Sequence, residues 1–288
     1  MDIAAIITTI AIIGLMGVML AMGTTLRMPD FLRVIQQPRA LLLGLTGQMV
    51  LLPSVAFGLG LALNLSAPVA VGLIVIASCA GGAPSNAVCA IAKGDVALSV
   101  TMTAISSMVA FLTVPVFVSF GVVHYYGEGS SLQLPFWETA ARIFLTTFLP
   151  VAGGMALGRF APRIAEAIRR PLFLGGFGVV LITSCFFLIS RVEMLTSMEA
   201  LSAVVVFNLM MMVLAYSLGR AMRLNEAEVR SVTVEIGMPN ISMSIVVIMG
   251  ILDAPELIGP TFFFLPLAYV TGLGFAFLVR RFRAPLLA

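Results

Sequence analysis

Apolar stretches long enough to cross a lipid bilayer follow one another along almost the whole of this 288-residue chain. A helix needs about 20 apolar residues to span the hydrocarbon core. On that rule the sequence predicts about nine spans. They run over 4–25, 40–63, 68–93, 96–121, 138–158, 171–190, 200–219, 229–252 and 258–279. Because lipid offers no hydrogen bonds to an open backbone, we expect an all-α polytopic membrane protein.

The composition agrees with lipid as the solvent. Hydrophobic residues make up 60% of the chain and charged residues 10%, whereas a soluble domain has about 25% charged residues. The net charge of +3 does not indicate a nucleic-acid partner, because the basic residues lie in short connections between apolar runs. The short connections predict a single membrane domain over 1–288, with the lipid bilayer as its partner and no obligate protein partner evident.

The positive charges predict an orientation. With the N-terminus outside and nine crossings, 14 of the 16 basic residues fall on the inner side, which leaves only Arg142 and Arg191 outside. Inner connections of membrane proteins carry this excess of lysine and arginine. The first apolar run precedes Arg27, so we interpret it as a spanning helix and not as a signal peptide. We therefore expect a multi-pass protein of the cell (inner) membrane with a cytoplasmic C-terminus.

Two of the predicted spans are interrupted in the middle. The third contains Gly81, Gly82 and Pro84, and the eighth contains Gly237 and Pro239. Glycine tolerates non-helical backbone angles, and proline removes a hydrogen-bond donor and clashes with the preceding turn. The two spans cross the membrane in opposite directions, so paired breaks favour inverted repeats with two broken crossing helices, as in secondary transporters. Two ordinary proline kinks are the alternative.

Polar residues follow both breaks, and an ordinary proline kink would not require them. Ser85 and Asn86 follow the first, and Asn240 follows the second. Such residues favour the first position of a restarting helix, so we expect half-helices that begin near Ser85 and Asn240. The free N–H groups at these two starts would attract an anionic substrate.

Glu235 is an acidic residue deep inside an apolar span, just before the second break. A charge at that depth costs at least about 2.5–3.5 kcal/mol, so it is expected to face a cavity and to have a partner. Ser99 and Thr103, four residues apart on one helix face, add oxygen atoms. Hydrogen bonds back to their own helix are the alternative for such a pair taken alone. An all-oxygen set suits a hard cation such as sodium. A transported proton at Glu235 remains the other option.

The residues around both breaks resemble a known family. The stretch GGAPSNAVCAIAKGDVALSVTMTAISSMVAFLTVPVF (81–117) resembles the signature of the bile acid:sodium symporter family, and VEIGMPN (234–240) resembles its second crossover motif. The likeness extends over nearly the whole chain, which is similar to a bacterial nine-span member lacking the first helix. The resemblance implies a panel (1–30 and 135–192) and a core (38–121 and 199–282). It also implies alternating access, in which the core moves against the panel.

The same resemblance implies the ion ligands. One sodium ion would be held by Ser85, Asn86, Ser99, Thr103 and Glu235. A second would use Gln48, Glu235 and the backbone carbonyls of Ile236 and Met238, but Pro239 replaces the glutamine that completes this site in the family, so the second site is doubtful.

The substrate positions depart from the family as well. Ala83 and Pro84 replace its Thr-Ala pair, and with Asn240 they would meet the substrate. Bile acid is therefore not expected.

The expected function is sodium-coupled symport of a small organic anion. A proton-coupled or uncoupled transporter of an organic acid in the same fold is the alternative. An enzyme is not expected, because the spans contain no HExxH motif, no GxSxG motif and no paired aspartates.

Overall fold

A computed structural model describes residues 3–27, 29, 38–79, 81–128, 135–190 and 197–281. Within these ranges the structure is helical and contains no β-strand, which confirms the all-α prediction. Six described segments are each long and apolar enough to cross a membrane. They are Ile6–Gly23, Pro38–Ala62, Val96–Tyr126, Phe136–Phe160, Met198–Ala221 and Pro255–Arg281.

The three other predicted spans are helical as well. The third comprises α6 (Ala67–Ser78) and α7 (Ala83–Ile91). The sixth is the apolar part of α11 (Pro162–Ser190). The eighth comprises α13 (Glu226–Gly237), α14 (Ile241–Val246) and the π-helical turn Val247–Ile251. The other α-helices of the described ranges are α1 (Ile3–Gly23), α4 (Pro38–Thr46), α5 (Leu52–Ala62), α8 (Val96–Tyr126), α9 (Phe136–Ile143), α10 (Leu149–Phe160), α12 (Met198–Ala221) and α15 (Gly259–Arg281).

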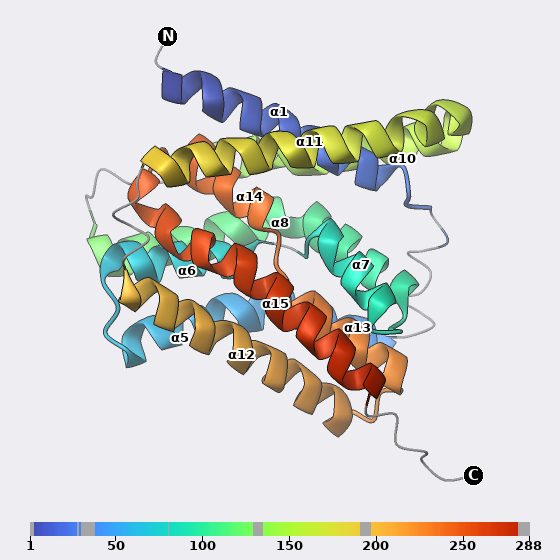
Figure 1. Cartoon of the computed structure of the whole chain (residues 1–288). Coiled ribbons are helices and arrows are strands. Elements are labelled where there is room, and N and C mark those ends of the chain that lie inside the picture. Colours follow the sequence, from blue (N-terminus) through green and yellow to red (C-terminus); the bar gives the residue numbers. More distant parts are fainter. Residues whose placement is uncertain are drawn as a thin grey trace.

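The helices α1, α10 and α11 lie together in one layer (Figure 1). The axes of α1 and α10 approach closely because glycines face each other. A Cβ atom on Gly23 would lie 2.2 Å from the carbonyl oxygen of Val151, and one on Gly154 would lie 2.2 Å from the carbonyl oxygen of Leu20. Only glycine permits this contact, which brings the ends of α1 and α10 together.

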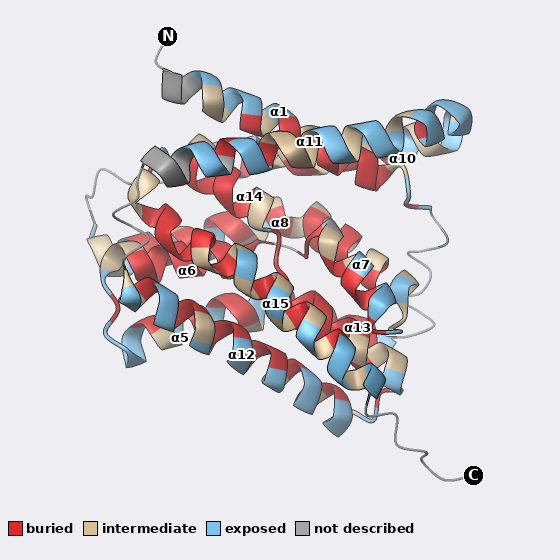
Figure 2. Ribbon diagram, in the orientation of Figure 1, coloured by how far each residue is buried: buried red, intermediate tan, exposed pale blue. Residues whose placement is uncertain are grey.

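A second group of helices packs below this layer in the view of Figure 1. The helix α12 packs against α13 and α15, and α6 packs against α5 and α8. Their shared core contains Phe207, Phe264, Leu73 and Met102, all buried. Buried residues line the faces between helices, whereas exposed residues lie on the outward faces (Figure 2). Many of these outward residues are large and apolar, which fits a surface in contact with lipid.

Both predicted breaks are present, and they meet. The helix α6 ends at Ser78 and α7 begins at Ala83, while α13 ends at Gly237 and α14 begins at Ile241. An isolated antiparallel bridge joins Gly81 to Pro239, so the two unwound segments lie side by side. These segments and the half-helices around them are called the crossover below.

The prediction of the caps was right for one half-helix and wrong for the other. The Asn240 side chain caps α14 and accepts a hydrogen bond from the backbone N–H of Met243 at 3.0 Å. The cap of α7 is Gly82, so Ser85 and Asn86 lie inside the helix. The reason is Pro84, which occupies the first turn, where its missing N–H leaves one fewer donor to satisfy.

Candidate ion-binding site

Glu235 lies in the last turn of α13, at the crossover, and is fully buried. Its Oε2 atom lies 2.7 Å from the hydroxyl oxygen of Ser85 and 2.7 Å from that of Ser99. Its Oε1 atom accepts a hydrogen bond from the hydroxyl of Thr103. Among the described residues no arginine, lysine or histidine forms an ion pair with this carboxylate. The charge is therefore surrounded by neutral oxygen atoms.

Three helices supply these hydroxyl groups and the carboxylate. Ser85 comes from α7, Ser99 and Thr103 come from α8, and Glu235 comes from α13. The side chain of Asp95 caps α8 through a hydrogen bond from the backbone N–H of Leu98 at 3.0 Å. That cap fixes where α8 begins and thereby directs Ser99, and Thr103 one turn later, toward the crossover.

Asn86 reaches the carboxylate only through Ser99. Its Oδ1 atom lies 2.8 Å from the hydroxyl oxygen of Ser99, and no hydrogen bond joins it to Glu235. Four of the five residues in the first predicted ligand set therefore surround one point, and Asn86 lies one contact further out.

The oxygen atoms around Glu235 outnumber the protons available to them. The Ser85 hydroxyl oxygen lies 2.6 Å from the Gly82 carbonyl oxygen and 2.7 Å from Glu235 Oε2, and the Ser99 hydroxyl likewise faces two oxygen atoms. A hydroxyl has one proton to donate, so the second contact in each case brings lone pairs together. Turning the Asn86 amide would supply a proton to Ser99, but the Ser85 hydroxyl has no such remedy. A cation or a proton on Glu235 would relieve this repulsion.

The second predicted ligand set is only partly assembled. The Gln48 side-chain N–H donates to the backbone carbonyl of Glu235 at 3.1 Å, and its Oε1 atom is buried with no hydrogen-bond partner. Ile236 and Met238 are buried on either side of Gly237. Pro239 offers no side-chain oxygen to this set.

Two of the predicted substrate residues line a small cavity beside the break. Pro84 and Asn240 line a cavity of about 30 Å³ together with Phe177 of α11 and Tyr269 of α15. Ala83 opens α7, but its side chain lies outside the described residues. The cavity has room for about one water molecule, so it is too small for an organic anion in this conformation.

Asn208 contacts the crossover from a neighbouring helix, a role that was not predicted from the sequence. It comes from the middle of α12, and its side-chain N–H donates to the carbonyl of Gly237 at 2.8 Å. That carbonyl belongs to the last residue of α13, where no following helical turn can bond it. A buried asparagine in an otherwise apolar span was the available signal, because such side chains need a hydrogen-bond partner.

Replacing Asn208 by alanine should lower the unfolding free energy by about 1–3 kcal/mol, because the buried carbonyl of Gly237 would lose its partner. The measurement is the thermal unfolding midpoint of the purified protein in detergent. Ser107→Ala is the matched control, since the Ser107 hydroxyl is buried without a hydrogen-bond partner and its removal should cost little. Equal midpoints for the two variants would show that Asn208 does not hold the break.

These features define a class of protein. An all-α membrane protein with two oppositely directed broken helices that meet at buried polar groups has the architecture of a secondary transporter. The chain belongs to the sodium bile acid symporter family, whose sequence model matches residues 12–198. This is a family of membrane transporters and not of enzymes.

Curated relatives carry transporter names. The chain is 28% identical to the uncharacterized sodium-dependent transporter YocS of Bacillus subtilis over 77% of this chain and 68% of that protein. It is 29% identical to the probable sodium/metabolite cotransporter BASS2 of rice, over 80% of this chain and 54% of that protein. It is 26% identical to the rat hepatic sodium/bile acid cotransporter, over 92% of this chain and 73% of that protein. The alignment thus spans only about half the length of the rice protein.

Proposed function

We propose that the protein is a secondary active transporter that couples the movement of sodium to that of a small organic anion. The observation that carries this proposal is the cluster of oxygen atoms around Glu235, which has too few protons for its contacts. Sodium prefers oxygen ligands, and its single charge balances one carboxylate. Ser85, Ser99, Thr103 and Glu235 would bind the ion directly, with Asn86 in support.

Transport would proceed by alternating access. In this proposal α1, α9, α10 and α11 form the panel, and the remaining helices form the core that moves against it. The small cavity at the crossover supports this division, because Phe177 of the panel closes a space that Pro84 and Asn240 of the core would open to substrate. The positive charges favour an external N-terminus and a cytoplasmic C-terminus in the cell membrane.

A proton-coupled or uncoupled transporter is the second candidate. The same observation favours it, since a proton on Glu235 would also relieve the repulsion between the oxygen atoms around Ser85. The names of the relatives, which include sodium-dependent transporters, support sodium instead.

Sodium binding by the purified protein tests the proposal. Sodium should raise the thermal unfolding midpoint, whereas choline at equal ionic strength should not. The added stability should be about 2.7 kcal/mol at a hundredfold excess over Kd. Because Pro239 provides no side-chain oxygen for a second ion, the titration should have a Hill coefficient near one. A coefficient near two would contradict a single site, and a response to pH in place of sodium would favour the proton-coupled alternative.

A further inference from the structure

A second group of polar residues lies about one helical turn from the ion-binding site, on the same three helices. It consists of Cys89 in α7, Asp95 at the N-cap of α8 and Ser231 in α13. Each is four residues away from a residue of the site, and those site residues are Ser85, Ser99 and Glu235. Four residues of an α-helix rise about 6 Å and end on the same face. These three residues are called the polar layer below.

The three members of the polar layer contact one another across the helices. The Cys89 Sγ atom lies 3.2 Å from the hydroxyl oxygen of Ser231. That hydroxyl lies 3.0 Å from the backbone carbonyl oxygen of Asp95 and 2.8 Å from that of Ala227. A hydroxyl has one proton, so lone pairs of these oxygen atoms remain available. Sodium prefers oxygen ligands, and the layer offers them one turn away from Glu235.

The polar layer lies between the ion-binding site and one end of the molecule. At that end α7 finishes, α13 begins beside it, and the connection 92–95 leads into α8 (Figure 1). The backbone N–H of Asp95 donates to the carbonyl of Ala227 in the first turn of α13 at 3.2 Å. Asp95 is partly exposed at this end, whereas Glu235 is fully buried. The proposed orientation of the chain assigns this end to the cytoplasm.

Close packing shuts the polar layer in this structure. Cys89 and Ser231 are both fully buried. A Cβ atom on Gly94 would lie 2.7 Å from the Cys89 Sγ atom and 2.7 Å from the Ser231 hydroxyl oxygen, so only a glycine lets the connection approach this closely. The guanidinium of Arg230 donates to the carbonyl of Ala92 at 3.1 Å and holds the same connection against α13. A cation can therefore pass the layer only if α7 and α13 separate.

We propose that sodium reaches and leaves Glu235 through the polar layer, that the contact between Cys89 and Ser231 is the gate, and that bound sodium holds this gate shut. An ion bound by Ser85, Ser99 and Glu235 would join α7, α8 and α13 one turn away from the gate. Its departure removes that link, and α7 and α13 are then free to separate. The proposal rests on the proposed function, because it takes Glu235 to be a sodium ligand.

The reactivity of the Cys89 thiol tests the gate. The chain has three cysteines, so Cys79→Ala combined with Cys185→Ser leaves Cys89 as the single thiol. The reagent is aminoethyl methanethiosulfonate, a small cation that modifies thiols, and the modified fraction is followed by the mass of the intact protein. Cys89 should react in choline and should react at least tenfold more slowly in saturating sodium at equal ionic strength. Glu235→Gln in the same background should remove this protection.

Cys79 provides the matched control thiol. It is buried like Cys89, but it ends α6 and packs in a different part of the core. A protein that keeps Cys79 alone, through Cys89→Ser and Cys185→Ser, is treated in the same way. Sodium should protect Cys79 at least fivefold less than Cys89. Equal protection of the two thiols would overturn the proposal, because it would show that sodium tightens the whole fold and not this gate.

Removal of the Ser231 hydroxyl tests the other side of the gate. Ser231→Ala deletes the group that contacts the Cys89 thiol, so the thiol should be modified at least threefold faster in choline. Thr233→Ala is the control on the same helix, because the hydroxyl of Thr233 donates to the carbonyl of Val229 in α13 itself at 2.7 Å. Its rate should stay within twofold of the parent protein. Equal rates in the two variants would contradict a gate formed by Ser231.

The unfolding midpoint separates failure of this proposal from failure of the proposed function. If sodium raises the midpoint but Cys89 reacts equally fast in sodium and in choline, the ion passes elsewhere and only the gate is overturned. The same conclusion follows if Cys89 is unreactive in both salts, since the layer then does not open. If sodium does not raise the midpoint, the proposed function fails and the gate fails with it.

Discussion

Replacing Glu235 by glutamine should abolish the stabilisation of the protein by sodium while leaving the protein folded. Glutamine keeps the size of the side chain, removes its charge and replaces one acceptor oxygen by an NH2 donor. Folding should survive because a fully buried carboxylate without an ion-pair partner in the described structure has been replaced by a neutral group. The whole sodium response, about 2.7 kcal/mol at a hundredfold excess over Kd in the wild type, should be lost. The measurement is the unfolding midpoint as a function of sodium concentration.

Substitutions of the residues around Glu235 should reduce the sodium response without abolishing it. Ser99→Ala and Thr103→Ala each remove one neutral ligand, so sodium should bind more weakly but still stabilise the protein. Glu138→Gln is the control for loss of a carboxylate, because Glu138 lies in an exposed ion pair with Arg142 that contributes little. An unchanged sodium response in Glu235→Gln would place the cation elsewhere in the molecule.

The crossover was predictable from the sequence because its chemistry is unusual for a membrane span. Gly81 and Pro239 mark backbone where a break in a helix is favoured, and both lie where the structure joins the two breaks. A buried charge such as Glu235 needs partners, and the family resemblance, more than the shared helix face, implied that Ser99 and Thr103 lie beside it, as they do in the structure. Local backbone chemistry therefore identified the breaks and the cost of burying charge identified Glu235, while the surrounding ligands were implied by the resemblance.

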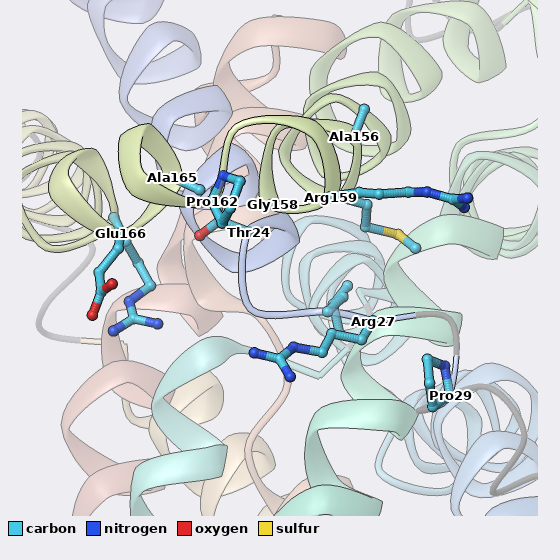
Figure 3. Close-up of a pocket in the computed structure, with 12 residues that line it drawn as sticks. Thr24, Arg27, Pro29, Ala156, Gly158, Arg159, Pro162, Ala165 and Glu166 are labelled. Carbon is cyan, nitrogen blue, oxygen red and sulfur yellow. The ribbon is translucent and has the colours of Figure 1, made fainter.

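The parts that the sequence did not predict depend on contacts between distant helices. Asn208 forms its hydrogen bond with the end of α13 because α12 packs beside α13, and no local sequence pattern predicts that packing. Arg27 and Arg159 line one cavity (Figure 3) at the ends of α1 and α10, two helices that Gly23 and Gly154 allow to approach closely. As residues of a sequence, these arginines only indicate the inner side of the membrane. Their grouping requires the three-dimensional structure.

Replacing Gly81 by alanine should weaken sodium binding at least tenfold and lower the unfolding free energy by about 1–3 kcal/mol, the usual cost of overpacking a buried site. A Cβ atom at this position would lie 2.1 Å from Glu235 Oε1 and 2.8 Å from Gln48 Nε2. Neither separation is compatible with real contacts, so the carboxylate or the break must shift. Any shift of Glu235 separates it from the hydroxyl groups of α7 and α8.

The control for this substitution is Gly58→Ala in α5, where an added Cβ atom meets nothing within 4 Å. Alanine favours a helix over glycine by up to about 1 kcal/mol, so this control should keep or slightly raise the unfolding midpoint and leave sodium affinity unchanged. Both variants are compared by sodium titration of the unfolding midpoint. The added methyl group acts on the ion site itself only if Gly81→Ala loses sodium affinity as well as stability. A loss of stability with wild-type sodium affinity would contradict this prediction, because it would show that the crossover relaxes around Gly81 without moving the carboxylate.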